Sequence, residues 1–97
     1  MGRTPLTNDT IQTALAGLEG WSYGDDALSK TFEFGSFREA VSFFVRVSFE
    51  AEQLNHHPEV ENVYNRVKLT LRTHDAGGKV TEADVALARA IESFSWL

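Results

Sequence analysis

The three histidines of this 97-residue chain are its side chains best suited to chemistry at neutral pH. His56 and His57 are adjacent in the stretch AEQLNHHPEVENVYN, residues 51–65, where Pro58 follows them directly, and His74 lies further along the chain. Imidazole ordinarily gains and loses a proton near neutrality, which suits general acid–base catalysis. All three positions are expected at the ends of secondary-structure elements, where functional side chains are common.

The adjacent histidines allow three interpretations. They can form a polar turn, because a histidine near a helix C-terminus satisfies terminal carbonyl groups and interacts favourably with the helix dipole. They can bind a metal together with His74 and Glu52, although the spaced pattern H-E-x-x-H is absent. They can transfer protons. A serine hydrolase has no support, because the chain has no G-x-S-x-G sequence.

Three polar residues near the histidines have candidate roles. Glu52 lies four residues before His56, so the two share a helix face if the helix continues that far. Glu52 is then either a solvated carboxylate or a group that orients a histidine or accepts a proton. Asp84 lies three residues after Thr81, which predicts a helix-capping partner. Thr73 is either an ordinary strand residue or a hydrogen-bond donor to a ligand beside His74.

Three helices are predicted around these residues. Apolar spacing predicts the first over residues 8–18, and Gly20 is a natural stop. The second is expected over residues 36–55, with a capping box at its start, and the third begins at Thr81. The apolar residues of the second helix spread over more than one face, which indicates burial on more than one side, one of them against another subunit. Its apolar residues include Phe37, Val41, Phe44 and Ala51 in one stripe, and Phe43, Val45, Val47 and Phe49 beyond it.

Two hairpins separate these helices. The first is expected over residues 21–34 with a turn at GDD, and the second follows Pro58 and turns near Tyr64 and Asn65. Residues 66–72 alternate between apolar and polar, as in a strand with one buried face. The order α-β-β-α-β-β-α predicts an α+β fold with two layers, in which helices pack on one face of an antiparallel four-stranded sheet. The length predicts one domain over residues 1–97.

Composition excludes several classes of function. The chain has no cysteine, so disulfides, thiolate nucleophiles and cysteine-ligated metals are excluded. The net charge of −5 argues against direct nucleic-acid binding, because a phosphate backbone attracts basic surfaces. No apolar run is long enough to span a membrane, and the N-terminus does not resemble a signal peptide. The expectation is a cytoplasmic protein that does not bind membranes.

Longer sequence motifs surround the candidate residues. They are E-Q-L-N-H-H-P at 52–58, N-V-Y-N at 62–65, V-x-L-T-L-x-T-H at 67–74 and T-E-x-D at 81–84. Upstream are GW at 20–21, F-E-F at 32–34 and SFREAVSFFVRVSFEAE at 36–52. In the residues and spacing of these motifs, the chain resembles the pterin-4a-carbinolamine dehydratase family from about residue 10 onward.

The resemblance implies a dehydration. The family removes water from the 4a-hydroxytetrahydropterin left by aromatic amino acid hydroxylases, gives the quinonoid dihydropterin, and needs no metal or organic cofactor. The resemblance assigns two sets of residues. The catalytic set is His56, His57, His74 and Glu52, and the substrate-contact set is Asn55, Pro58, Thr73, Asp75, Ala76 and Asp84.

The chain departs from the animal members of the family at a few positions. Asn55 replaces an aspartate, Val60 replaces a tryptophan, and the connection AGGKV, residues 76–80, is one residue longer. None of these changes removes a histidine, so catalytic activity is expected to survive.

The resemblance also implies partners. The resemblance points to a pterin substrate, and the long apolar helix is the expected interface of a homodimer or a homotetramer. The alternative function is a non-catalytic binding role, because animal members also act as dimerisation partners of a homeodomain transcription factor. Another branch serves as a RuBisCO assembly factor and has lost the catalytic pattern. All three histidines are present here, which favours catalysis.

Overall fold

Each helix begins where a side-chain hydroxyl accepts a hydrogen bond from a backbone N–H that has no helical partner. The computed structural model describes residues 3–94, so both ends of the predicted domain lie outside the description. Thr7 caps α1, Ser36 caps α2 by accepting from the N–H of Glu39, and the Thr81 hydroxyl accepts from the N–H of Ala83 at the start of α3. The helices are α1 (Asn8–Leu15), α2 (Phe37–Leu54) and α3 (Glu82–Phe94).

The first helix is shorter than the sequence predicts. It ends at Leu15 rather than Leu18, and the chain continues in turns to Gly20, which has a φ of 86°. Hydrogen bonds from Gly17 N–H to Ala14 and from Leu18 N–H to Leu15 replace the wider α-helical pattern. This tighter winding still buries Leu18, so the apolar residues of this segment reach the core although the helix is not continuous.

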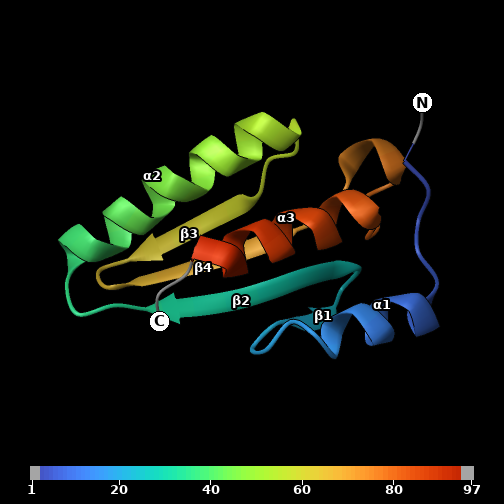
Figure 1. Ribbon diagram of the computed structural model, residues 1–97, viewed down its shortest axis with the longest axis horizontal. Coiled ribbons are helices and arrows are strands. Elements are labelled where there is room, and N and C mark those ends of the chain that lie inside the picture. The colour runs from blue at the N-terminus through green and yellow to red at the C-terminus, as the bar shows by residue number, and fades with distance from the viewer. Residues whose placement is uncertain (1–2, 95–97) are drawn as a thin grey trace.

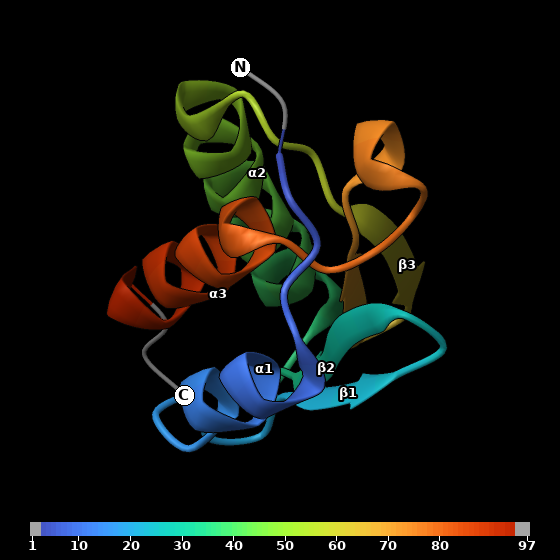
Figure 2. The same cartoon turned by 90° about the vertical axis from the view of Figure 1, so that its right-hand side faces the viewer.

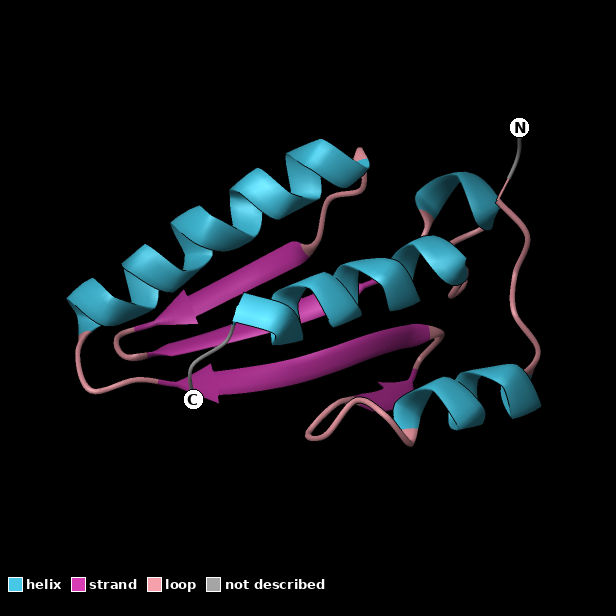
Figure 3. Ribbon diagram, viewed as in Figure 1, coloured by secondary structure: helices cyan, strands magenta, loops and turns pink. Residues whose placement is uncertain are grey.

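The four strands form one antiparallel sheet in the order β1-β2-β4-β3 (Figure 3). The first hairpin turns at Asp25 and Asp26, which both have positive φ, and the second turns at Tyr64, as expected near that residue. In the first hairpin, left-handed backbone at both central positions suits a two-residue turn. The strands are β1 (Ser22–Gly24), β2 (Ala27–Glu33), β3 (Glu59–Val63) and β4 (Arg66–Leu71).

The helices cover one face of the sheet, and the core lies between the two layers (Figures 1 and 2). The predicted α+β class, element order and two-layer arrangement are confirmed. Strand β4 alternates as expected, with Val67, Leu69 and Leu71 buried. Phe43 of α2 packs on Phe32 of β2 with ring centroids 4.6 Å apart. Trp21 is buried in this core.

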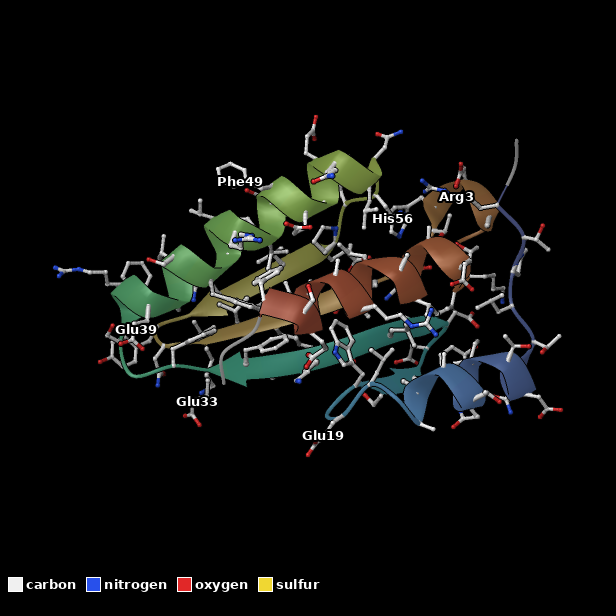
Figure 4. All side chains as sticks on the ribbon, viewed as in Figure 1. Arg3, Glu19, Glu33, Glu39, Phe49 and His56 are labelled. Atoms are coloured by element: carbon white, nitrogen blue, oxygen red, sulfur yellow. The ribbon has the colours of Figure 1, made fainter. Side chains whose placement is uncertain are left out.

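Helix α2 buries a different stripe from the one with the most phenylalanines. Its buried residues are Ala40, Phe43, Val47 and Ala51. Phe37, Val41, Phe44, Val45 and Phe49 are exposed, and Figure 4 shows Phe49 pointing away from the sheet. Phe43 fills the space between helix and sheet, and the smaller residues on the same stripe let the helix approach the sheet closely. The remaining apolar surface of α2 is not covered by any part of residues 3–94. Within the same residues, no helix is both long and apolar enough to cross a bilayer.

Four segments meet at one end of the molecule, on the right in Figure 1. They are the C-terminal end of α2, the chain after β4, the start of α3 and the N-terminal segment. Figure 2 shows this last segment running past the start of α3 toward α1. The N–H of Leu6 donates to the carbonyl of Val80, at 2.9 Å, which holds the segment in place. This convergence brings the three histidines toward one another.

Candidate active site

The end of α2 decides where the adjacent histidines point. Asn55 has φ 52° and ψ 44°, the left-handed conformation that asparagine adopts more readily than most residues. Its N–H donates to the carbonyl of Glu52, and the N–H of His56 donates to that of Ala51, which together make a Schellman motif. The helix therefore stops before His56, and the chain reverses direction there. Asparagine and aspartate are both tolerated in this conformation, so the departure at Asn55 keeps the local fold.

His56 points inward and contacts protein groups through both ring nitrogens. Its side chain is only 6% exposed. Nε2 lies 2.5 Å from Oδ1 of Asp84, and Nδ1 lies 2.9 Å from Nη1 of Arg3. Figure 4 shows Arg3 and His56 facing each other from different segments. The imidazole is thus held between a carboxylate and a guanidinium.

Asp84 is fully buried and has two roles, of which its position in the sequence predicted the first. Oδ2 accepts from the N–H of Thr81 at 2.9 Å, which is the capping contact expected at the start of α3. The same oxygen accepts from the hydroxyl of Thr73 at 2.8 Å, and Oδ1 contacts His56. Thr73 is fully buried as well. Its hydroxyl therefore supports Asp84 and does not reach the surface where a ligand would bind.

Glu52 pairs with His57 instead of His56. Because the helix ends at Leu54, the shared helix face that would have joined Glu52 to His56 does not form. Oε1 of Glu52 lies 3.1 Å from Nε2 of His57, and the two side chains are 82% and 61% exposed. An exposed pair of this kind contributes little to stability. It leaves the His57 ring accessible and beside an acceptor.

His74 lies in a tightly closed loop. A short 3₁₀ helix, η1 (His74–Ala76), follows β4, and Gly77 and Gly78 both have positive φ. The N–H of Thr73 donates to the carbonyl of Lys79, and the N–H of Gly78 donates back to Thr73. The connection through these glycines is therefore tied across its base. It presents His74 and Asp75 to solvent.

An open cleft of about 440 Å³ brings half of the predicted residues together, including all three histidines. Its lining comes from the α2–β3 connection, the loop after β4 and the N-terminal segment. Glu52 and Pro58 line a neighbouring pocket of about 220 Å³, which shares His57 with the cleft. The buried pair Thr73 and Asp84 lies behind His56, and Ala76 is half-buried in η1. The residues lining the cleft are Arg3, Asn55, His56, His57, Arg72, His74 and Asp75.

Two arginines of the cleft were not predicted as site residues. Nε of Arg72 lies 3.0 Å from Oε2 of Glu59, and the outward phase of β4 places it two residues before His74. The alternation along β4 could therefore have identified Arg72 as a site residue. Arg3 precedes the first helical or strand pattern in the chain, and no sequence feature identifies it. Its contact with His56 spans 53 residues and exists only in the folded chain.

The cleft has the groups for proton transfer. His57 and His74 are accessible and come from two different elements, so they can serve two positions on one bound molecule. Arg3 and Arg72 add hydrogen-bond donors, and Asp75 adds an acceptor. Within residues 3–94, no group of three histidine or carboxylate side chains is arranged to hold a metal ion.

Comparison with known proteins gives one consistent family. The sequence profile described as pterin 4 alpha carbinolamine dehydratase matches residues 4–94. A protein of Opitutus terrae, provisionally named a pterin-4-alpha-carbinolamine dehydratase, is 62% identical over 94 residues, which cover 97% of each chain. A provisionally named relative from Rhizobium leguminosarum is 53% identical over 89 residues, covering 90% of this chain and 87% of that protein.

Two solved structures are similar to this fold. A transcriptional coactivator/pterin dehydratase from Brucella melitensis is 40% identical, with a TM-score of 0.86 over 92% of this chain and 96% of that one. A pterin dehydratase-like protein, identified as a RuBisCO assembly factor in the alpha-carboxysome, is 27% identical. Its TM-score is 0.63, over 77% of this chain and 88% of that one. Proteins of similar fold are thus named both as enzymes and as an assembly factor.

Proposed function

The chain belongs to the pterin 4 alpha carbinolamine dehydratase family, and from this we propose that it dehydrates a 4a-hydroxytetrahydropterin by histidine acid–base catalysis. The observation that carries the proposal is the cleft, where His57 and His74 present accessible imidazoles from separate elements. The product is the quinonoid dihydropterin of tetrahydropterin recycling.

The reaction requires two proton transfers and no oxidant. The bond between carbon 4a and its hydroxyl oxygen breaks, and the oxygen takes a proton from a general acid and leaves as water. N5 loses its proton to a general base, and its electron pair forms the double bond to carbon 4a. Two accessible imidazoles on separate elements of the cleft suit this pair of transfers. Glu52, beside His57, accepts a hydrogen bond from that ring and orients it.

The remaining predicted residues have supporting positions. His56 contacts Asp84 and Arg3, so it lies at the floor of the cleft with its nitrogens engaged. Asn55 and Asp75 line the cleft and can contact the pterin. Pro58 shapes the adjoining pocket, Ala76 belongs to η1, and the buried Thr73 and Asp84 act through His56. No resident cofactor is needed for this chemistry.

The decisive assay follows the 4a-hydroxypterin directly. A hydroxylase generates the carbinolamine, and its loss is recorded with and without this protein. Acceleration that persists in a strong chelator is expected, whereas acceleration abolished by the chelator would favour the metal interpretation. No acceleration with folded protein would refute the enzyme assignment.

Substitution of the accessible histidines tests their roles. His57→Ala and His74→Ala are each expected to lose about 10²-fold or more in kcat/KM, the usual contribution of a positioned acid or base. Gln53→Ala is the matched control, because Gln53 is exposed beside this site but does not line the cleft. Normal rates in both histidine variants would exclude proton transfer by these groups.

A binding role is the second candidate, favoured by the exposed apolar residues of α2. Phe37, Phe44 and Phe49 form part of an uncovered surface on a chain with a net charge of −5. Large exposed apolar patches usually mark interaction sites. We propose that this surface joins copies of the chain into a homodimer or homotetramer. The same surface would serve a coactivator-like or assembly-factor-like role if the dehydratase assay failed.

A cytoplasmic location is a further prediction, which cell fractionation tests.

A further inference from the structure

Arg3 reaches the site from a segment far away in the sequence. Its Nη1 lies 2.9 Å from Nδ1 of His56, and its Nη2 donates to the carbonyl of Asn55 at 3.0 Å. The segment behind it is fixed by the bond between Leu6 and Val80. One guanidinium therefore holds both the last turn of the α2 connection and the imidazole that follows it.

The contact with Arg3 determines where the proton of His56 lies. A guanidinium has only donors, so Nδ1 must be the acceptor and carries no proton. The proton of the neutral ring is then on Nε2, which donates it to the carboxylate of Asp84 at 2.5 Å. A proton on Nδ1 would point at the N–H groups of Arg3, and the two donors could not form this contact. The two nitrogens of His56 are occupied, while His57 and His74 remain accessible.

We propose that Arg3 is a positioning residue that fixes His56 as the neutral Nε2–H tautomer and leaves proton transfer to His57 and His74. The proposal deepens the dehydratase function and rests on it. Without Arg3, the α2–β3 connection loses one of its ties, and Nδ1 of His56 loses the donor that makes it an acceptor. The His56 ring at the floor of the cleft would then be less fixed in orientation.

A nitrogen-detected NMR experiment tests the tautomer without any substrate. The ring nitrogens of the full chain are observed at neutral pH, with His57→Gln and His74→Gln used to assign His56. The expected spectrum has an unprotonated Nδ1 and a protonated Nε2 for His56, and Arg3→Ala shifts the Nδ1 resonance because the hydrogen bond from Arg3 is lost. A protonated Nδ1 in the unsubstituted protein, or no change in Arg3→Ala, would overturn the proposal.

Kinetics test the positioning role. Arg3→Ala is expected to lower kcat about tenfold, equivalent to about 1.4 kcal/mol, with KM changed less than about twofold. Arg3→Lys, which keeps a donor and the charge, should recover part of this loss. Arg38→Ala is the matched control, because Arg38 is exposed on the first turn of α2 and outside the cleft. Circular dichroism verifies that each variant is folded.

The outcomes separate this proposal from the function on which it rests. A rise in KM alone would make Arg3 a substrate contact, and a higher kcat would make it an inhibitory latch. Either result refutes positioning. If the unsubstituted protein does not dehydrate the carbinolamine, the proposed function fails, while the NMR spectrum still decides whether Arg3 sets the tautomer of His56.

Discussion

Replacing the carboxylate of Asp84 by an amide should destabilise the protein strongly although the side chain keeps its shape. Asp84 is fully buried and accepts from three donors, Nε2–H of His56, the hydroxyl of Thr73 and the N–H of Thr81. An amide has one acceptor oxygen and one NH₂ group. In Asp84→Asn, at least one of these donors must therefore face another donor.

The size of the effect follows from these contacts. A hydrogen bond to a charged group contributes about 1.5–3 kcal/mol, and a buried donor left without a partner costs about 1–3 kcal/mol. The oxygen can stay with Thr73 and Thr81, which places the NH₂ group against His56. His56 cannot relieve the conflict by changing tautomer, because Arg3 occupies Nδ1. The expected loss is about 2–4 kcal/mol for the one broken contact and the weakened remaining pair.

Urea denaturation at a fixed protein concentration measures this loss. A domain of this size should also lose at least about 8 °C in Tm, at about 4 °C or more per kcal/mol. Glu82→Gln is the matched control on the same helix, because its pair with Arg89 is solvent-exposed, and it should change stability by less than about 0.5 kcal/mol. A loss below about 0.5 kcal/mol in Asp84→Asn would refute the three-donor network.

The other predictions concern the α2 connection and the apolar surface. Asn55→Gly should keep stability within about 0.5 kcal/mol, because glycine suits the left-handed position, whereas Asn55→Val should lose about 1–2 kcal/mol; equal stabilities in urea would contradict the Schellman geometry. Phe49→Ser should lower the oligomeric state measured by light scattering, since Phe49 is 65% exposed on α2. An unchanged mass, with Thr31→Ser on the open sheet face as control, would place the interface elsewhere.

Much of the fold could be predicted because its signals are local. The capping residues Ser36 and Thr81 mark two helix starts, and the alternation along residues 66–71 gave the buried face of β4. The end of α1 was missed, since tighter turns after Leu15 bury Leu18 as well as a helix would. The buried stripe of α2 was also not evident, because its phenylalanines lie on both faces and only the packed sheet selects one.

The candidate site divides in the same way. The sequence by itself determined the residue types, three histidines with Glu52 and Asp84 at spacings that resemble one family, because the chemistry depends on those side chains. Only the tertiary structure decided which groups meet. The left-handed Asn55 turns His56 inward to Asp84 and leaves Glu52 to His57, and the N-terminal segment brings Arg3 to His56. Contacts between residues 28 or 53 positions apart depend on how the layers pack, and no local pattern encodes them.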